Sequence, residues 1–303
     1  MKIDLLVPTR NRVKRLYNFL NSIKNTAYDK QNIAIYFYVD NDDEGTINNI
    51  ENIKRDFNDL QIIFKIGPRI VLSNCWNALW NISQNEIIMH SGDDILFISK
   101  NWDQKVIEEF NKINDKLILV YGPDGIQNEK LGTHSFISRK ATKILGYFVP
   151  PYFPWGHNDT WLNIIYSILQ RRKYFPEIII EHQHFIKYPQ FMDEVYLYKE
   201  KQYALSGIKW AETRPKRLAD AKKLLQFIDI SPISKLKIKS IIYLKQVESF
   251  VITIISLFKL KLDIIILNTL KRTLKVSKIF KNNSEFPLKK PLDYMVLKFN
   301  KAI

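Results

Sequence analysis

The chain has almost no cysteine. Cys75 is the only cysteine among its 303 residues, so neither an intrachain disulfide nor a cysteine-based zinc site can form. Proteins that fold without disulfides are typical of a reducing compartment. We therefore expect the protein to lie in the cytoplasm.

Long apolar runs are missing as well. No uncharged stretch reaches the roughly 20 residues that a membrane-spanning helix requires. The apolar run at residues 3–8 is far too short for a signal peptide and contains Asp4. The sequence thus predicts a chain that stays on the cytosolic side and spans no membrane.

Positive charge is concentrated near the carboxyl end. Residues 231–303 carry fifteen basic and four acidic side chains, which is +11 of the total net charge of +15. The lysines are interleaved with aliphatic clusters such as residues 250–258. We expect an amphipathic helical region that either lies on an anionic membrane surface, at the inner face of a membrane, or packs and self-associates. Nucleic-acid binding is disfavoured because stacking aromatics are not interleaved with the lysines.

The remaining composition indicates a folded α/β protein. Hydrophobic residues make up 46% and aromatics 13% of the chain, which argues against disorder. Strand-like and helix-like patterns alternate in the first half, as in a mainly parallel sheet covered by helices. We expect one domain over residues 1–230 and the basic helical region over residues 231–303. Strands are predicted at residues 3–7, 33–39, 61–66, 86–90, 117–121, 133–138 and 177–185, and helices at 13–23, 71–83, 103–113, from 158 or 159 onward, and 193–227.

Two adjacent acids, Asp93 and Asp94, follow the apolar run 86–90 after a short Ser-Gly step. Ligands of open α/β sheets bind at the carboxyl ends of the strands, and carboxylate oxygens are good ligands for hard divalent cations. The pair is therefore a candidate metal site. The alternative is that the two acids cap the next helix or solvate a turn.

Other polar groups follow predicted strands or loops. Pro8–Arg12 comes directly after the first strand, where Arg10 and Arg12 can offer paired donors to a phosphate. The aromatic segment 149–156 cannot be regular structure because its prolines lack N–H donors. This segment suits either the wall of a binding site or a packed surface loop, and Asp159 follows it closely.

In chain order, these motifs resemble the family 2 glycosyltransferases of GT-A fold: Pro8–Arg12, the acidic turn that begins at Asp40, Asp93 with Asp94, and Asp159. The resemblance covers roughly residues 1–190. It implies a Rossmann-like mixed, mainly parallel sheet flanked by helices. It also implies inverting transfer of a sugar from a nucleotide-diphosphate sugar to a hydroxyl acceptor, in glycan or polysaccharide synthesis.

The resemblance assigns the donor nucleotide sugar to one set of residues. Asp40 would accept hydrogen bonds from the base or ribose, and a solvated turn is the alternative for this acidic segment. The donor-binding residues that the resemblance implies are Pro8, Thr9, Arg10, Arg12, Asp40, Asp42, Arg69, Asn77 and Asp93.

The resemblance also implies a Mn²⁺ or Mg²⁺ held by Asp94, which would stabilise charge on the departing nucleotide. His182 and His184 lie two residues apart in a predicted strand and therefore share one face. Either could complete the metal shell, as a histidine does in some GT-A enzymes, and imidazole suits several transition metals. The alternative is that both are ordinary histidines of the core or surface.

Asp159 occupies the place of the family's catalytic base, which would take the proton of the acceptor hydroxyl. Asn158 stands where the family commonly has another acid. The alternative role for Asp159 is a helix cap.

Three other functions are alternatives to sugar transfer. A sugar nucleotidyltransferase would require a glycine-rich phosphate loop near the first strand. This function is disfavoured because Pro8–Arg12 contains no glycine. A carboxylate-pair hydrolase is disfavoured because the adjacent Asp93 and Asp94 cannot flank a sugar from both sides. A non-catalytic protein that binds nucleotide sugars on a degenerate GT-A fold stays open.

Overall fold

The computed structural model describes residues 1–273, without the side chains of residues 198–204 and 253–273. The chain divides into two compact units, Met1–Tyr243 and Leu244–Ile303. All features of the candidate site lie in the first unit. The expectations for residues 274–303 lie outside the described residues.

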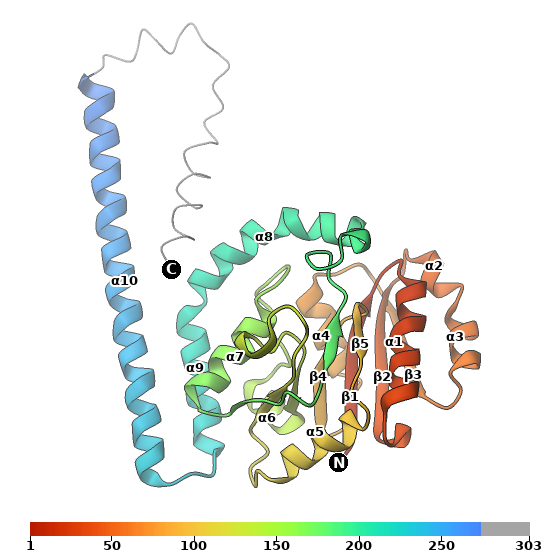
Figure 1. Ribbon diagram of the computed structural model, residues 1–303. Helices are drawn as coiled ribbons and strands as arrows, with labels where there is room; N and C mark the ends of the chain where they lie inside the picture. Colours follow the sequence, from red (N-terminus) through yellow and green to blue (C-terminus); the bar gives the residue numbers. More distant parts are fainter. Residues whose placement is uncertain (274–303) are drawn as a thin grey trace, which may run out of the picture. The chain divides into compact units, whose positions relative to one another are not determined.

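A seven-stranded sheet forms the centre of the first unit, in the order β3-β2-β1-β4-β7-β6-β8. Figure 1 labels its strands β1, β2, β3 and β4. β1 pairs in parallel with β2 and β4, β2 with β3, and β6 with β8, while β7 is antiparallel to both β4 and β6. This mixed, mainly parallel sheet confirms the predicted fold class. The strands are β1 Ile3–Thr9, β2 Ile33–Asp40, β3 Gln61–Gly67, β4 Ile87–His90, β6 Leu119–Tyr121, β7 Ser135–Ser138 and β8 Arg172–Tyr174.

Helices supply apolar residues to both faces of the sheet. Alternate residues of β1 divide between two buried clusters, with Leu6 in one and Leu5 and Val7 in the other. A strand buried on both faces explains why this segment reads as a continuous apolar run. One cluster includes residues of α1 Val13–Thr26, α3 Ile50–Asp56 and α5 Trp102–Asn111. The other includes residues of α4 Leu72–Trp80, α6 Arg139–Leu145, α7 Asn158–Ile168 and α9 Arg214–Phe227.

The strand register brings the candidate residues to one edge of the sheet. Leu6 pairs with His90, and Pro8 pairs with Tyr38, so β1, β2 and β4 run in the same direction and end near one another. The polar segments that follow these strands therefore meet at a common carboxyl edge, as expected for ligand binding in open sheets.

Some elements differ from the sequence-based expectations. The strand expected at 177–185 is limited to β9 Ile180–His182, which pairs with β5 Ile95–Phe97 in a separate two-stranded sheet. The expected helix at 193–227 is divided into α8 Glu194–Glu212 and α9, because Pro215 lies in the first turn of α9 and cannot donate to a preceding turn. β5 and β8, of three residues each, were not predicted. The short helix α2 Glu44–Ile47 lies in the acidic turn after β2.

The first turns of α10 Pro232–Thr273 belong to the first unit. Ile238 and Ile242 are buried in the same apolar cluster as Leu224 and Leu225. The division between a catalytic domain and a basic region at residue 230 stays a prediction. Over residues 1–273, no helix combines the length and the apolar character needed to cross a bilayer.

Candidate active site

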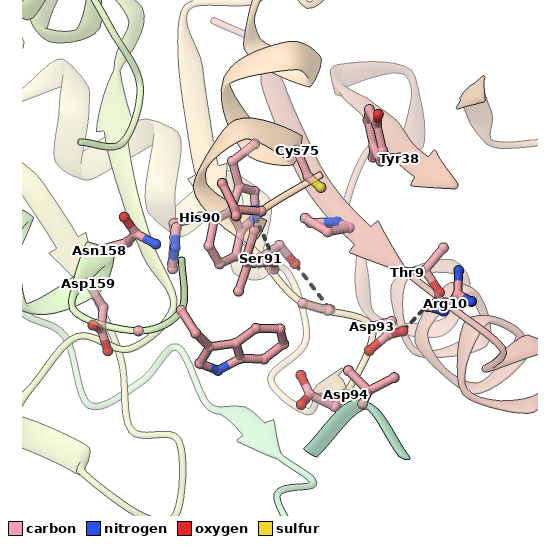
Figure 2. A pocket seen from close by; sticks show the side chains of 18 of the residues that line it. Thr9, Arg10, Tyr38, Cys75, His90, Ser91, Asp93, Asp94, Asn158 and Asp159 are labelled. Atoms are coloured by element: carbon pink, nitrogen blue, oxygen red, sulfur yellow. Dashed lines mark hydrogen bonds between the residues drawn. The ribbon is translucent and has the colours of Figure 1, made fainter. Parts of the chain in front are cut away.

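A cavity of about 550 Å³ lies at the carboxyl edge of the sheet (Figure 2). Most of the predicted site residues, which are up to 176 positions apart in the chain, line it together. Asp42 and Asn77 are not part of this lining in the described structure. The predicted residues that line the cavity are Pro8, Thr9, Arg10, Arg12, Asp40, Arg69, Asp93, Asp94, Asp159, His182 and His184.

Asn77 supports the loop that forms one wall of the cavity. Its Nδ2 donates to the carbonyl of Val149 at 2.8 Å, and its Oδ1 accepts from the amide of Phe148 at 3.0 Å. These bonds fix the chain just before the aromatic, proline-rich segment. The Asn77 side chain thus already forms hydrogen bonds with the backbone of residues 148 and 149. Its contact with the donor stays a prediction.

Arg10 is held between two carboxylates that follow β2. Its Nη1 donates to Asp40 at 3.0 Å, and the two oxygens of Asp42 accept from Nη1 and, at 3.0 Å, from Nη2. Burial raises the pKa of Asp40, and Arg10 opposes that rise. Asp42 is more exposed, and its hydrogen bond with Arg10 lowers its pKa. The arginine is thus oriented at the cavity wall before any ligand arrives.

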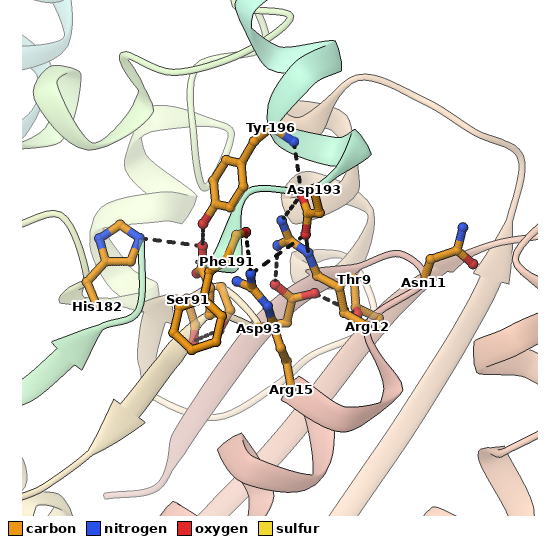
Figure 3. Close-up of polar contacts among 12 residues, drawn as sticks. Thr9, Asn11, Arg12, Arg15, Ser91, Asp93, His182, Phe191, Asp193 and Tyr196 are labelled. Atoms are coloured by element: carbon orange, nitrogen blue, oxygen red, sulfur yellow. Dashed lines mark hydrogen bonds and ion pairs between the residues drawn. The ribbon is translucent and has the colours of Figure 1, made fainter. Parts of the chain in front are cut away.

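Arg12 joins Asp93 to the start of α8 (Figure 3). Its Nη1 donates to Asp93 at 2.7 Å, and its Nε and Nη2 donate to Asp193 at 2.8 and 3.0 Å. Thr9 Oγ1 donates to the other oxygen of Asp93 at 2.8 Å. Asp193 also accepts from the amide of Tyr196, which fixes the first turn of α8. Sequence reasoning missed Asp193 and Tyr196 as parts of the site, since their only signal was the start of a helix.

Asp94, His134 and His182 form a group of possible metal ligands. One ligand atom from each lies within 4.8 Å of the others, and His182 Nε2 is 3.5 Å from Asp94 Oδ2. The same oxygen accepts a hydrogen bond of 2.6 Å from the hydroxyl of Tyr196. One carboxylate and two imidazoles suit a transition metal such as Mn²⁺ better than Mg²⁺.

His134 supports this interpretation. Neither of its ring nitrogens has a hydrogen-bond partner among the described residues, although both are buried. Burial, aided by the charge of His182, lowers the pKa of His134 to about 3, so the ring is neutral and keeps a lone pair for a metal. The residues present therefore fit a divalent transition metal. Sequence reasoning missed His134, because a single histidine just before β7 has no spacing signal.

His184 lies beside His182, with 5.0 Å between the ring centroids. Its Nδ1 accepts from the amide of Ile186 at 3.2 Å, and it is not a member of the compact ligand group. Of the two predicted histidines, the geometry thus favours His182 as the ligand.

Asp159 lies in the first turn of α7. Gly156 and His157 have positive φ angles of 70° and 60°, which turn the chain sharply from the aromatic segment into the helix. The expected cap by Asn158 or Asp159 is wrong: the helix begins at Asn158, and no side chain caps it. Asp159 Oδ1 accepts from the amide of its neighbour Thr160 at 2.7 Å. The carboxylate thus lines the cavity without a capping role.

Two buried side chains beside Asp159 line the cavity with unpaired polar atoms. Asn158 Oδ1 and Nδ2 and His90 Nε2 have no hydrogen-bond partner in the part of the chain that the structure describes. An unpaired buried polar group costs about 1–3 kcal/mol. Hydroxyl groups of a bound ligand would relieve that cost, and sequence reasoning had treated His90 only as part of a strand.

Residues 4–197 match the sequence profile of Glycosyl transferase family 2. The chain belongs to this family. The match covers all of the sheet except Ile3 and ends within α8, just beyond Asp193 and Tyr196, so it includes every candidate residue described above. No curated protein sequence matches the chain.

Solved structures of glycosyltransferases share the fold. The mannosyltransferase PcManGT from Pyrobaculum calidifontis, in complex with GDP-Man and Mn²⁺, superposes with a TM-score of 0.51 at 14% identity over 80% of each chain. Residues 1–349 of S. aureus TarS give a TM-score of 0.53 at 13% identity, over 78% of this chain and 69% of that one. Their complex with UDP-GlcNAc gives 0.52 at 13% identity, over 78% and 70%.

These comparisons confirm the predicted GT-A fold and the prediction that the chain is a glycosyltransferase. As in the resemblance inferred from the sequence, the family match ends before the basic region.

Proposed function

We propose that this glycosyltransferase is an inverting, metal-dependent enzyme that transfers a sugar from a nucleotide-diphosphate sugar to a hydroxyl of a glycan acceptor. One observation carries the proposal. A single cavity contains a compact group of carboxylate and imidazole ligands and, from a different element, the carboxylate of Asp159. An inverting transfer needs both a site for the diphosphate and a base for the acceptor.

The donor would bind along the carboxyl ends of β1, β2 and β4. Asp40 would accept from the base or ribose, Asp93 would face the ribose, and Arg10, Arg12 and Arg69 would offer positive charge to the diphosphate. Asp94, His134 and His182 would hold the metal. When bound there, Mn²⁺ would supply positive charge that stabilises the departing nucleoside diphosphate.

Asp159 would accept the proton of the acceptor hydroxyl as its oxygen attacks the anomeric carbon. The new carbon–oxygen bond forms on the face opposite the diphosphate, and the bond between the anomeric carbon and the diphosphate oxygen breaks. Attack from the opposite face inverts the configuration. Asn158 and His90 would bind sugar hydroxyls through their unpaired polar atoms.

A direct test incubates the full chain with Mn²⁺ and a panel of nucleotide sugars that includes GDP-mannose and UDP-GlcNAc, with and without glycan acceptors. We expect one donor to release its nucleoside diphosphate faster with an acceptor, and to give a product of inverted anomeric configuration by NMR. Retained configuration, or equal rates after Mn²⁺ is removed with EDTA, would contradict the mechanism. No donor binding or turnover at all would favour the non-catalytic alternative.

We also propose that α10 holds the enzyme on an anionic membrane surface, as suits an enzyme of polysaccharide synthesis. Between its start and Phe250, α10 exposes Leu236, Leu244 and Phe250, and lysines lie between them in the sequence. Apolar side chains with flanking positive charge favour the interface of an anionic bilayer. We expect the full chain to sediment with phosphatidylserine vesicles and a chain ending at Tyr243 to stay in the supernatant. A full chain that dimerises and does not sediment would favour self-association.

A further inference from the structure

A second carboxylate lies behind His182, on the side away from Asp94. Asp124 is 2% exposed and is not among the described residues that line the cavity. Its Oδ2 is buried, has no hydrogen-bond partner among the described residues, and lies 3.9 Å from Nδ1 of His182. His182 thus has one ring nitrogen facing each carboxylate.

The carboxylate of Asp124 has a fixed orientation. Its Oδ1 accepts hydrogen bonds from three successive amides, those of Ile126, Gln127 and Asn128, at 2.7–2.9 Å. Three donors on one oxygen prevent the group from rotating. The other oxygen is therefore directed by the fold, and His182 is the residue that it approaches.

The backbone also holds Asp124 and His182 together. The amide of His182 donates to the carbonyl of Asp124 at 2.9 Å, and the amide of Ile180 donates to that of Pro123 at 3.0 Å. Gly122 allows this approach, because a Cβ there would lie 1.7 Å from the carbonyl oxygen of Ile178. The next residue, Gln183, donates through its amide to the carbonyl of Asp94 at 2.7 Å. His182 is thus fixed between the two acids by main-chain bonds.

The two ring nitrogens need different protonation states if His182 is a ligand. Nε2 must offer a lone pair to a metal at Asp94, so the proton of a neutral ring must reside on Nδ1. A carboxylate that accepts this proton selects the required tautomer and orients the ring. Asp124 Oδ2 lies 3.9 Å from Nδ1, so an approach of about 1 Å would form this hydrogen bond.

We propose that Asp124 is a positioning residue that holds His182 in the tautomer and orientation that bind the metal. The inference rests on the proposed function, since it needs a metal at Asp94 and His182. Asp124 is not part of the cavity lining and would act only through the imidazole.

Asp124→Asn tests the role with minimal disturbance. The amide oxygen of Asn can still accept from the three backbone amides, and the three N–H donors prevent the side-chain NH₂ from taking that place. The NH₂ group then faces His182 Nδ1 and favours the wrong tautomer. Asp115→Asn is the control, because Asp115 is another buried acid that accepts from backbone amides and lies outside the cavity lining. Asp115 also pairs with Arg171 at 2.9 Å, so its substitution sets an upper limit for the loss of stability.

The primary readout is the Kd for Mn²⁺ alone, from the EPR signal of free Mn²⁺, and the second is the visible spectrum of the Co²⁺-loaded protein. We expect Asp124→Asn to weaken Mn²⁺ binding about 10- to 100-fold and to change the Co²⁺ spectrum. The melting temperature of Asp124→Asn in EDTA should fall no further than that of Asp115→Asn. The Mn²⁺ affinity of Asp115→Asn should equal that of the wild type.

Unchanged Mn²⁺ affinity in Asp124→Asn would overturn the inference, provided that His182→Ala weakens binding. If His182→Ala also leaves the affinity unchanged, the proposed metal site itself fails, and the inference fails with it. An equal loss of metal-independent binding of UDP and GDP in Asp124→Asn would indicate general distortion of the site and would also overturn the positioning role.

Discussion

Arg12 Nη1 lies 2.7 Å from Asp93 Oδ1, although 81 positions separate the two residues in the chain. Both side chains are largely buried, with 9% and 4% of their surface exposed. This ion pair connects the end of β1 to the segment that carries Asp94. It therefore stabilises the fold and fixes the position of the proposed metal ligand at the same time.

Loss of one member of this pair should be costly. Arg12→Met leaves the carboxylate of Asp93 buried without its charged partner, and such changes cost about 3–5 kcal/mol. We expect a decrease of that size in the free energy of unfolding, measured by urea denaturation in EDTA. The double variant Arg12→Met with Asp93→Asn should be more stable than the sum of the single effects predicts. Strict additivity would show that the two residues are not coupled.

Asp94→Asn should weaken the binding of nucleoside diphosphate in the presence of Mn²⁺ at least tenfold, because a neutral amide is a poorer metal ligand than a carboxylate. Binding in EDTA should change little. Calorimetry with UDP and GDP gives both values. Asp59→Asn is a suitable control, since Asp59 pairs with Lys24 and Lys30 at the surface. Equal weakening with and without Mn²⁺ would remove Asp94 from the metal site.

His90 should make stability depend on pH. Burial lowers the pKa of His90 below its usual 6.5, and Asp159 opposes the shift. The unfolded chain therefore binds a proton near pH 6.5 that the folded chain binds only at lower pH. This contribution to stability is complete above about pH 6.5 and is lost as the pH falls toward the folded pKa, by up to about 1.4 kcal/mol per pH unit.

His90→Asn removes the titratable imidazole. His90 Nδ1 lies 3.1 Å from the carbonyl oxygen of Thr133, and the amide of Asn can still donate to this oxygen. The variant should be less stable overall, because the ring packs on Trp76 at 4.0 Å between centroids. Its free energy of unfolding should fall less steeply than that of the wild type between pH 7 and pH 5, by urea denaturation in EDTA. Parallel pH profiles would show that His90 is not the group responsible.

The carboxyl-terminal boundary can be tested by truncation. A chain that ends at Tyr243 keeps Ile238 and Ile242, which are buried in the core, and should melt close to the full chain. A chain that ends at Ser231 loses both isoleucines. Each loss should lower the free energy of unfolding by about 2–5 kcal/mol, so this chain should unfold at a much lower temperature. Equal melting temperatures would show that the domain is complete at residue 231.

The sequence predicted the elements that have strong patterns. β1, β2, β3 and β4 are apolar runs that end in polar segments, and this pattern located Asp40, Asp93 and Asp94 correctly at one sheet edge. β8 could not be predicted from the sequence because it is short and polar. Only its pairing with β6 makes it a strand.

The partners of the site residues could not be predicted. Nothing local in the sequence pairs Arg12 with Asp193, or Tyr196 with Asp94, because the contact depends on where α8 begins relative to the sheet. His134 is a lone histidine in the sequence, and only the fold brings it near His182, with 4.7 Å between the ring centroids.

Asp159 is the proposed base that removes the proton of the acceptor hydroxyl. The most direct measurement compares wild type and Asp159→Asn in single-turnover transfer from the identified donor, with binding of the donor measured on the same samples. We expect the rate to fall about 10²- to 10⁴-fold, while the Kd of the donor changes less than about twofold. A variant that transfers sugar at the wild-type rate would contradict the mechanism.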